Sequence, residues 1–338
     1  MKRSLLLGLC AGVFMVAAGQ PVAGQDTVEL RYATSAPPKT PWAMQVERFQ
    51  QQVIENSKGR LKINAFLNSQ LGSEQDTVQQ VARGRIDMGG YSLTAASLLV
   101  PELALLNIPF LFESQKQQDC VYDNHLTQLT TDMLAKKGVV MLSWTEVGVA
   151  GFIGKKPILT PDDIKGLKAR SQPNKVAAFK WTKHGANPSP LPVTEWVSAH
   201  QTGLVDVADS APTFYFFSGL AKVAPVFTKS AHQDQGGVVI INKAAFDKLS
   251  KDRQEALLAT RKQSPGSQLR AEIRGFEGNI LQMHIKAGGQ VVEMSDVQRA
   301  VWRKSMIELW PQMVAAVGGE ADKFWKAIQD GSKVCAGA

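Results

Sequence analysis

The sequence predicts an α/β fold made of two lobes with similar organisation. Residues 28–88 follow the order strand, helix, strand, helix, strand, and residues 164–209 follow the order strand, helix, extended segment, helix, strand. Both stretches end on the same kind of pattern, Gly84-Arg85-Ile86-Asp87 in the first and Gly203-Leu204-Val205-Asp206 in the second. Two such lobes can enclose a small ligand between their facing surfaces.

Hydrophobic periodicity defines the elements of the first stretch. Alternating residues predict strands, and apolar residues at 42, 46, 49 and 53 predict a helix that Gly59 closes. The expected elements are Val28–Ala33 (strand), Trp42–Asn56 (helix), Leu61–Phe66 (strand), Glu74–Arg83 (helix) and Ile86–Met88 (strand).

The second stretch places one cationic side chain at a position typical of ligand sites. We expect a strand at Leu167–Arg170, a helix at Val176–His184 and a short strand at Leu204–Ala208. Prolines at 188, 190 and 192 hold the intervening segment extended. Arg170 therefore lies at the carboxyl end of a strand, where open α/β sheets bind their ligands.

The remaining elements connect the lobes and complete the chain. Glycines at 148, 151 and 154 indicate that Val147–Ile153 crosses between the lobes. The apolar run Gly237–Ile241 predicts a strand buried on both faces. The other expected elements are a strand at Val139–Trp144, a long helix at Ser267–Lys286, a helix capped by Ser295 and Gln298, and a short helix at Ala321–Gln329.

The N-terminus reads as a secretory signal peptide. Lys2 and Arg3 precede the apolar run Leu5–Ala18, and small residues follow it, so we expect residues 1–24 to be removed. No later segment reaches about 18 consecutive apolar residues, the length that spans a membrane. The mature chain is therefore expected to be exported and periplasmic.

Composition and motifs argue against several classes of function. The net charge of +8 falls to +6 without Lys2 and Arg3, and its scattered distribution does not favour nucleic-acid binding. Cys120 and Cys335 remain either as a disulfide or as two free thiols. The histidines lack a metal-binding spacing, with His200 expected inside a helix and His232 in a polar loop, and no GxSxG motif occurs. We expect no enzyme activity, no metal and no cofactor.

Several spaced motifs resemble the substrate-binding proteins of tripartite ATP-independent periplasmic (TRAP) transporters, the DctP-type family. They are Thr160–Arg170, Gly185–Pro188, Gln201–Gly203, Val205-Asp206, Asn68–Gly72, Gly84–Met88 and Ile108–Phe112. The resemblance implies a two-lobed periplasmic binding protein fold, a type II-like clamshell with discontinuous lobes and a long helix that spans both. The expected first lobe is 25–147 plus about 236–275, and the second is 148–235 plus about 276–338.

The resemblance also implies a function. The chain would capture an organic acid and deliver it, as a monomer, to the small and large membrane subunits of a TRAP transporter. A periplasmic sensor that presents an organic acid to a signalling receptor is one alternative, and a dicarboxylate-binding TRAP receptor is another.

Arg170 is the leading candidate for the ligand site. A guanidinium binds a carboxylate through two parallel hydrogen bonds, and Arg170 matches the KxR motif whose arginine does this in the family. A pair between Arg170 and Asp206 is the structural alternative. The family's other ligand-facing positions fall at Ser35, Glu74, Ser92, Val193 and Ser210, with Asp209 beside the last.

The nature of these residues predicts the class of ligand. A second arginine found in many members would fall at residues 149–151 and is absent here, which favours a monocarboxylate over a dicarboxylate. Aromatic residues expected near the cleft, namely Tyr91, Trp144, Phe214 and Tyr215, favour an apolar or aromatic body behind the carboxylate. Trp196 lies within a predicted helix and is expected mainly in the core.

Overall fold

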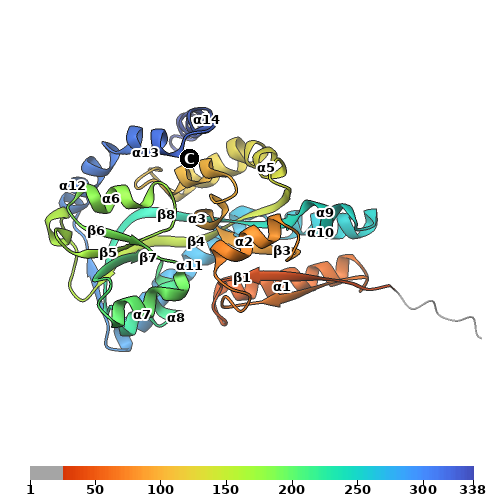
Figure 1. Ribbon diagram of the computed structural model, residues 1–338, viewed down its shortest axis with the longest axis horizontal. Helices are drawn as coiled ribbons and strands as arrows, with labels where there is room; N and C mark the ends of the chain where they lie inside the picture. The colour runs from red at the N-terminus through yellow and green to blue at the C-terminus, as the bar shows by residue number, and fades with distance from the viewer. Residues whose placement is uncertain (1–25) are drawn as a thin grey trace, which may run out of the picture.

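The computed structural model describes residues 26–338, so the predicted signal peptide lies outside the described residues. One group of elements, including α1, α9 and α10, lies at one end of the molecule, and another, including α6, α7 and α12, lies at the other end (Figure 1). Among residues 26–338, none of the helices combines the length and the apolar character that a membrane-crossing helix needs.

The strands all belong to one mixed sheet. Its order is β2-β1-β3-β8-β4-β7-β5-β6, and β9 pairs with β8. The strands are β1 (Val28–Thr34), β2 (Leu61–Phe66), β3 (Met88–Ser92), β4 (Val139–Gly154), β5 (Lys168–Ser171), β6 (Asn187–Pro190), β7 (Val207–Ser210), β8 (Val226–Asn242) and β9 (Gln290–Glu293).

Helices cover the sheet and connect its strands. The α-helices are α1 (Pro41–Asn56), α2 (Glu74–Ala82), α3 (Leu93–Ala96), α4 (Gln115–Val121), α5 (Thr127–Ala135), α6 (Ala177–Lys183), α7 (Trp196–Gln201), α8 (Pro212–Phe217), α9 (Lys243–Asp247), α10 (Lys251–Gln263), α11 (Gly266–Lys286), α12 (Asp296–Ile307), α13 (Trp310–Val317) and α14 (Ala321–Val334). Shorter 3₁₀ or π segments are η1 (Pro101–Asn107), η2 (Tyr122–Leu126), η3 (Pro161–Ile164), η4 (Val193–Glu195) and η5 (Leu220–Lys222).

Two long antiparallel strands, β4 and β8, join the lobes. The last part of β8 pairs with β3 on the side of β1 and β2, whereas the last part of β4 pairs with β7 on the side of β5 and β6. Each long strand therefore has one half in each lobe (Figure 1). This arrangement confirms the predicted two-lobed α/β fold.

The glycine-rich segment predicted to connect the lobes lies within β4. The pairing of β4 with β8 shifts register between Glu146 and Gly148 and again between Ala150 and Phe152. Gly148 has a φ of +128°, and a Cβ there would lie 2.0 Å from the Oε1 atom of Glu277. Only glycine fits this close approach of β4 to α11.

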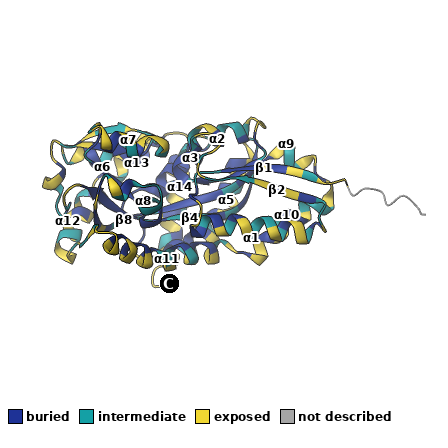
Figure 2. Ribbon diagram, turned by 90° about the horizontal axis from the view of Figure 1, so that it is seen from below, coloured by how far each residue is buried: buried dark blue, intermediate teal, exposed yellow. Residues whose placement is uncertain are grey.

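Helix α11 extends along both lobes, as predicted. It contacts β4, α8 of the second lobe and α1 of the first lobe, and it runs below the sheet in Figure 2. Glu272 of α11 binds the guanidinium of Arg48 on α1, with Nη2 and Oε2 2.8 Å apart.

The repeated Gly-Xaa-Ile/Val-Asp pattern has the same structural role in each lobe. Gly84 and Gly203 both have positive φ and follow a helix. The next acidic side chain then accepts a backbone hydrogen bond from another strand, Arg31 N to Asp87 at 2.8 Å and Lys168 N to Asp206 at 2.9 Å. The two bonds lie just before β3 and β7, and both strands begin later than the sequence predicted.

The segment before Gly237 corrects one expectation. The polar run around His232 was expected to be a loop, but it forms the first part of β8 and His232 is buried. Its polar side chains find partners inside the protein, including Ser230 Oγ 2.7 Å from His232 Nδ1. Alternation of apolar residues cannot reveal such a strand.

The C-terminal helices pack against elements that the sequence placed in the first lobe. Helices α13 and α14 contact η1, α4 and η2, and they share one apolar cluster that includes Leu105, Tyr122 and Phe324. The exact lobe boundaries stay a prediction. For α13 and α14, however, this packing favours the first lobe instead of the second lobe that the sequence suggested, because their apolar faces are buried there.

A disulfide links the C-terminal segment after α14 to α4. Cys120 at the end of α4 is bonded to Cys335 just after α14, with their Cα atoms 5.9 Å apart and 215 residues apart in sequence. Of the two alternatives that the sequence left open, the structure contains the disulfide.

We predict that replacing both cysteines, Cys120→Ser with Cys335→Ser, lowers the free energy of unfolding by roughly 2–4 kcal/mol, because the crosslink restricts the unfolded chain. Urea denaturation of both proteins measures this difference. Adding a reductant should destabilise the wild type and leave the double variant unchanged. Equal stability of the two oxidised proteins would contradict the prediction.

Candidate functional site

A cavity lies where the two lobes face each other. The first lobe contributes Ser35, Glu74, Tyr91 and Ser92, and the second contributes Arg170, Val193, Ser210 and Phe214. These are eight of the eleven residues that the sequence predicted for the site or the cleft around it. The cavity offers about 140 Å³ to the centres of water-sized molecules, and one water needs roughly 10–15 Å³ by this measure. Its size therefore suits a small molecule.

Arg170 is buried at the carboxyl end of β5. Its Nε and Nη2 atoms donate to the carbonyl oxygen of Leu191 at 2.9 and 2.8 Å, and its guanidinium lies 3.8 Å from the ring centre of Trp196. The extended Pro190–Pro192 segment presents the Leu191 carbonyl. The expected alternative, a pair with Asp206, is wrong because Asp206 binds the backbone of Lys168.

The charge of Arg170 has no contacting carboxylate among the described residues. Burial lowers its pKa to about 9, and the more distant charges of Asp209 and Glu74 oppose this shift. No hydrogen bond is formed by its Nη1 atom to any part of the chain that the structure describes. A buried guanidinium in this state favours a bound anion.

Glu74 and Ser92 form a hydrogen-bonded pair on the first-lobe wall. The two oxygens of Glu74 accept from the backbone N of Ser92 at 3.1 Å and from its Oγ at 2.9 Å. Burial raises the pKa of Glu74, although the bonds from Ser92 and the charge of Arg170 oppose the shift. Both carboxylate oxygens of Glu74 therefore have partners in Ser92.

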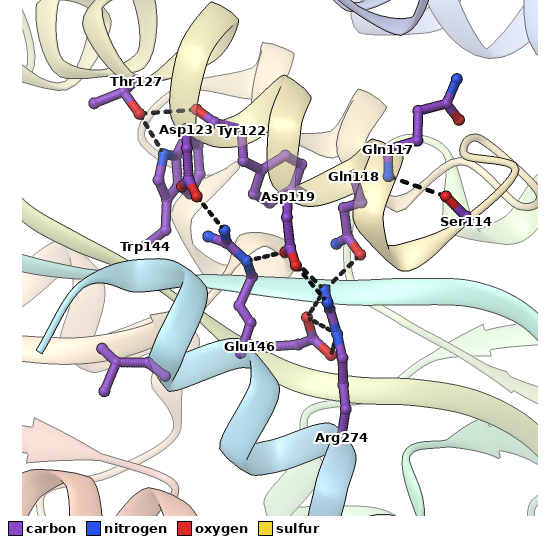
Figure 3. Close-up of polar contacts among 12 residues, drawn as sticks. Ser114, Gln117, Gln118, Asp119, Tyr122, Asp123, Thr127, Trp144, Glu146 and Arg274 are labelled. Atoms are coloured by element: carbon purple, nitrogen blue, oxygen red, sulfur yellow. Dashed lines mark hydrogen bonds and ion pairs between the residues drawn. The ribbon is translucent and has the colours of Figure 1, made fainter. Parts of the chain in front are cut away.

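Glu146 is a second acidic residue on the cavity wall, at the junction between the lobes. Both of its oxygens accept from Arg274 of α11, the shortest contact being 2.6 Å from Nη2 (Figure 3). Arg274 also donates to Asp119 of α4, and Arg270 of α11 pairs with Asp119 and Asp123. Burial raises the pKa of Glu146 to about 7, whereas the bonds and charge of Arg274 lower it. The acidic group is thus compensated by the protein itself.

Asp209 does not line the cavity. It is fully buried and forms an ion pair with Lys180 of α6, while His232 Nε2 lies 3.4 Å from its Oδ2. Although burial opposes it, the charge of Lys180 and the bond from His232 hold the pKa of Asp209 well below its usual range. Side chains alternate along β7, so Ser210 faces the cavity and Asp209 faces the opposite side.

Tyr215 and Trp144 are also directed into the core. Tyr215 is completely buried, and its hydroxyl donates to Ala224 O at 2.6 Å and contacts His284 Nε2 at 3.1 Å. Trp144 packs on Tyr122 with ring centres 4.7 Å apart. Their predicted contribution to the cleft is wrong, because both lie on the far face of their element.

Other cavity residues escaped the sequence analysis. Trp196 lines the cavity, where it contacts Arg170 and packs edge-on against Phe214. Thr94 donates to Gln172 Oε1 at 2.9 Å, a hydrogen bond that joins the two lobes. Further lining residues are Tyr32, Thr34, Trp42, Gln45, Phe49, Asn107 and Gln235. Most of these residues lie on helix faces or at strand ends, where no sequence motif marks them. Gln172 is an exception, because its position directly after β5 is one where ligand-binding residues are expected.

The described residues contain one cluster that resembles a metal site. Cys120, His125 and Cys335 place potential ligand atoms within 4.8 Å of one another. The two sulfur atoms form the disulfide, so neither is available as a thiolate ligand. This cluster therefore does not fit a metal ion.

Comparison with known proteins agrees with this architecture. A chain from Escherichia coli named 2,3-diketo-L-gulonate-binding periplasmic protein YiaO is 29% identical over 263 residues, which cover 77% of this chain and 79% of that protein. The sugar acid binding protein DctPAm from Advenella mimigardefordensis, solved in complex with galactonate, matches at 25% identity with a TM-score of 0.86 over 92% of this chain and 99% of that one.

A TRAP periplasmic solute binding protein from Sulfurospirillum deleyianum, solved with bound succinate, matches at 27% identity. Its TM-score is 0.82, and the match covers 88% of this chain and 97% of that one. The family model described as bacterial extracellular solute-binding protein, family 7 (DctP), matches residues 32–316. The chain therefore belongs to this family of extracellular solute-binding proteins, the DctP-type substrate-binding proteins of TRAP transporters.

Proposed function

We propose that this chain binds an organic acid between its lobes, holds the carboxylate at Arg170 and delivers the acid to a TRAP transporter. The observation that carries the proposal is the buried guanidinium of Arg170, which lines the cavity without a carboxylate partner among the described residues. A ligand carboxylate would supply the missing counter-charge through a charge-assisted hydrogen bond to this buried guanidinium.

The surroundings of Arg170 favour a single carboxylate on the ligand. On the first-lobe wall, the carboxylate of Glu74 accepts a hydrogen bond from Ser92. The charge of Glu146 is neutralised by its ion pair with Arg274. The other arginine on the cavity wall, Arg261, comes from α10 and donates to the carbonyl oxygens of Met141 and Leu142. We therefore place one anionic group of the ligand in the interlobe region, at Arg170.

Aromatic side chains support an apolar or aromatic body. Tyr32, Trp42, Phe49, Tyr91, Trp196 and Phe214 line the cavity and offer a large apolar contact surface. The relatives with galactonate and succinate show that members of this fold accept a sugar acid or a dicarboxylate. A dicarboxylate is accordingly the competing ligand class for this chain.

The cellular role follows from the family. We propose that the mature chain acts in the periplasm as a monomer, without enzyme activity. Its partners would be the small and large membrane subunits of the transporter. The named periplasmic relatives and the matching family model support this role.

We predict that Arg170→Ala weakens carboxylate binding by at least 100-fold, because an ionic hydrogen bond in a buried site is lost. Arg170→Lys should recover only part of the affinity, since an ammonium cannot form two parallel bonds. Isothermal titration of the mature chain against aliphatic and aromatic monocarboxylates, dicarboxylates and sugar acids provides the measurement.

Arg299→Ala is a matched control. Arg299 also donates to a backbone carbonyl, Ala231 O at 3.0 Å, and lies over the ring of Phe110, but it is outside the cavity. This variant should keep wild-type affinity. A ligand bound equally by wild type and Arg170→Ala would refute the assignment of Arg170, and tight binding of dicarboxylates alone would replace the proposed monocarboxylate.

We predict that Asp209→Asn destabilises the fold and leaves the affinity for ligand nearly unchanged. Removing this charge leaves Lys180 buried without its ion pair, which typically costs about 3–5 kcal/mol. Chemical denaturation measures the loss at neutral pH. The difference from wild type should shrink as the pH falls below about 4. The pKa of Asp209 is lower in the folded protein than in the unfolded chain, so its ionised form stabilises the fold at pH values above the unfolded pKa. This stabilisation is lost as the carboxylate is protonated in acid. A large loss of affinity without loss of stability would instead place Asp209 in the site.

A further inference from the structure

The cavity does not end at the interlobe cleft but continues into the first lobe. Beyond Tyr91 and Glu146 its walls come from α1, from the sheet and from the start of α11. We call this continuation the α1 arm. Its residues are Tyr32, Val46, Phe49, Leu142, Val239 and Leu269.

The sheet forms the floor of the α1 arm. Val239 lies in the middle of the sheet, where it is paired with Gly90 of β3 on one side and Ser143 of β4 on the other. A valine in this position is normally covered by a packed helix, yet Val239 is only half-buried and lines the cavity. Phe49 of α1 is likewise half-buried and lines the cavity. Helix α1 therefore leaves part of the apolar sheet surface uncovered.

Polar contacts hold α1 at this distance from the sheet. Trp42 Nε1 donates to Glu146 O at 2.7 Å, Gln45 Nε2 donates to Leu269 O at 2.9 Å, and Arg48 pairs with Glu272. These contacts lie along one side of α1 and tie it to β4 and α11. Protein interiors are normally close-packed, and an apolar space that persists is suited to an apolar guest.

The outer end of the α1 arm is polar. Gln52 Nε2 donates to Ser264 Oγ at 3.0 Å, and Thr260 and Arg261 complete this end. Arg261 is exposed and bonded to the carbonyl oxygen of Leu142 through Nε at 2.9 Å. A ligand tail that reaches this end would leave the apolar walls, so the arm sets a preferred tail length.

We propose that the α1 arm receives the apolar tail of a carboxylate whose head is bound at Arg170. The ligand class is then an amphipathic monocarboxylate with an extended alkyl or aryl-alkyl chain. This inference rests on the proposed function of the cleft. It adds a second contact region, confined to the first lobe, that selects the length and apolar character of the ligand.

Titration calorimetry with two homologous series tests the inference. The first series runs from acetate through butyrate and hexanoate to decanoate, and the second from phenylacetate to 6-phenylhexanoate. Burial of methylene groups in the arm should raise affinity by roughly fourfold per group. The gain should stop when the tail reaches the polar end near Ser264.

Val239→Phe fills the α1 arm from the sheet and keeps a residue with high strand propensity. We expect at least a tenfold loss of affinity for the long acids and less than a twofold change for the short ones. Phe49→Trp narrows the arm from α1 and provides a second variant if the first does not fold. Met44→Phe, on the exposed side of the same helix, is the matched control and should change neither series.

The outcomes separate this inference from the proposed function. Two results would refute tail binding in the α1 arm and leave the carboxylate site intact. One is affinity that depends on Arg170 but not on tail length. The other is an equal effect of Val239→Phe on short and long acids. Absence of binding by every carboxylate, or binding that ignores Arg170→Ala, would overturn the proposed function itself. Circular dichroism and the thermal midpoint of each variant without ligand show that it is folded.

Discussion

The pairing of β4 with β8 through both lobes is the constraint on which the rest of this structure depends. Each strand contributes one half to each lobe, so neither lobe has a complete sheet without the other. The crossing lies between Glu146 and Phe152, where the register shifts and Gly148 approaches α11. Helix α11 runs beside this crossing and contacts both lobes. The cavity walls meet at this junction, because Glu146 lines the cavity and also binds Arg274 of α11.

Electrostatic compensation then makes the cavity suitable for an anion. Glu74 is bonded by Ser92, Glu146 is bonded by Arg274, and Asp209 faces away from the cavity toward Lys180. Arg170 is different, because its hydrogen bonds go to a neutral carbonyl, its guanidinium lies over the ring of Trp196, and none of the described carboxylates pairs with it. These three acidic side chains therefore have hydrogen-bond or ion-pair partners within the protein, whereas the buried guanidinium of Arg170 is available to a ligand carboxylate.

Much of the fold, and several residues that line the candidate cavity, could be predicted from the sequence. Leu61–Phe66 is a strand with the predicted bounds, and the motif match to the family brought together Arg170, Glu74, Ser92 and Ser210, which do line one cavity. What failed were inferences that require knowledge of which face of an element points inward. Asp209 and Tyr215 lie next to cavity residues in sequence, yet both point into the core.

The lobe-crossing part of β8 was missed for a related reason. Its residues around His232 are polar, a pattern that indicates a loop when the partners are unknown. In the fold, Asp209 and Lys180 come from distant positions and make this polar strand compatible with burial. Likewise, the α1 arm has no sequence signal, since Val46, Phe49 and Val239 have the periodicity of ordinary core residues.

A crystal structure of the mature chain with its tightest-binding monocarboxylate tests the central claim most directly. Our account predicts that both carboxylate oxygens lie about 2.7–2.9 Å from guanidinium nitrogens of Arg170, with the apolar body against Trp196 and Phe214. A carboxylate bound elsewhere in the cavity, with Arg170 still bonded only to Leu191, would contradict the account.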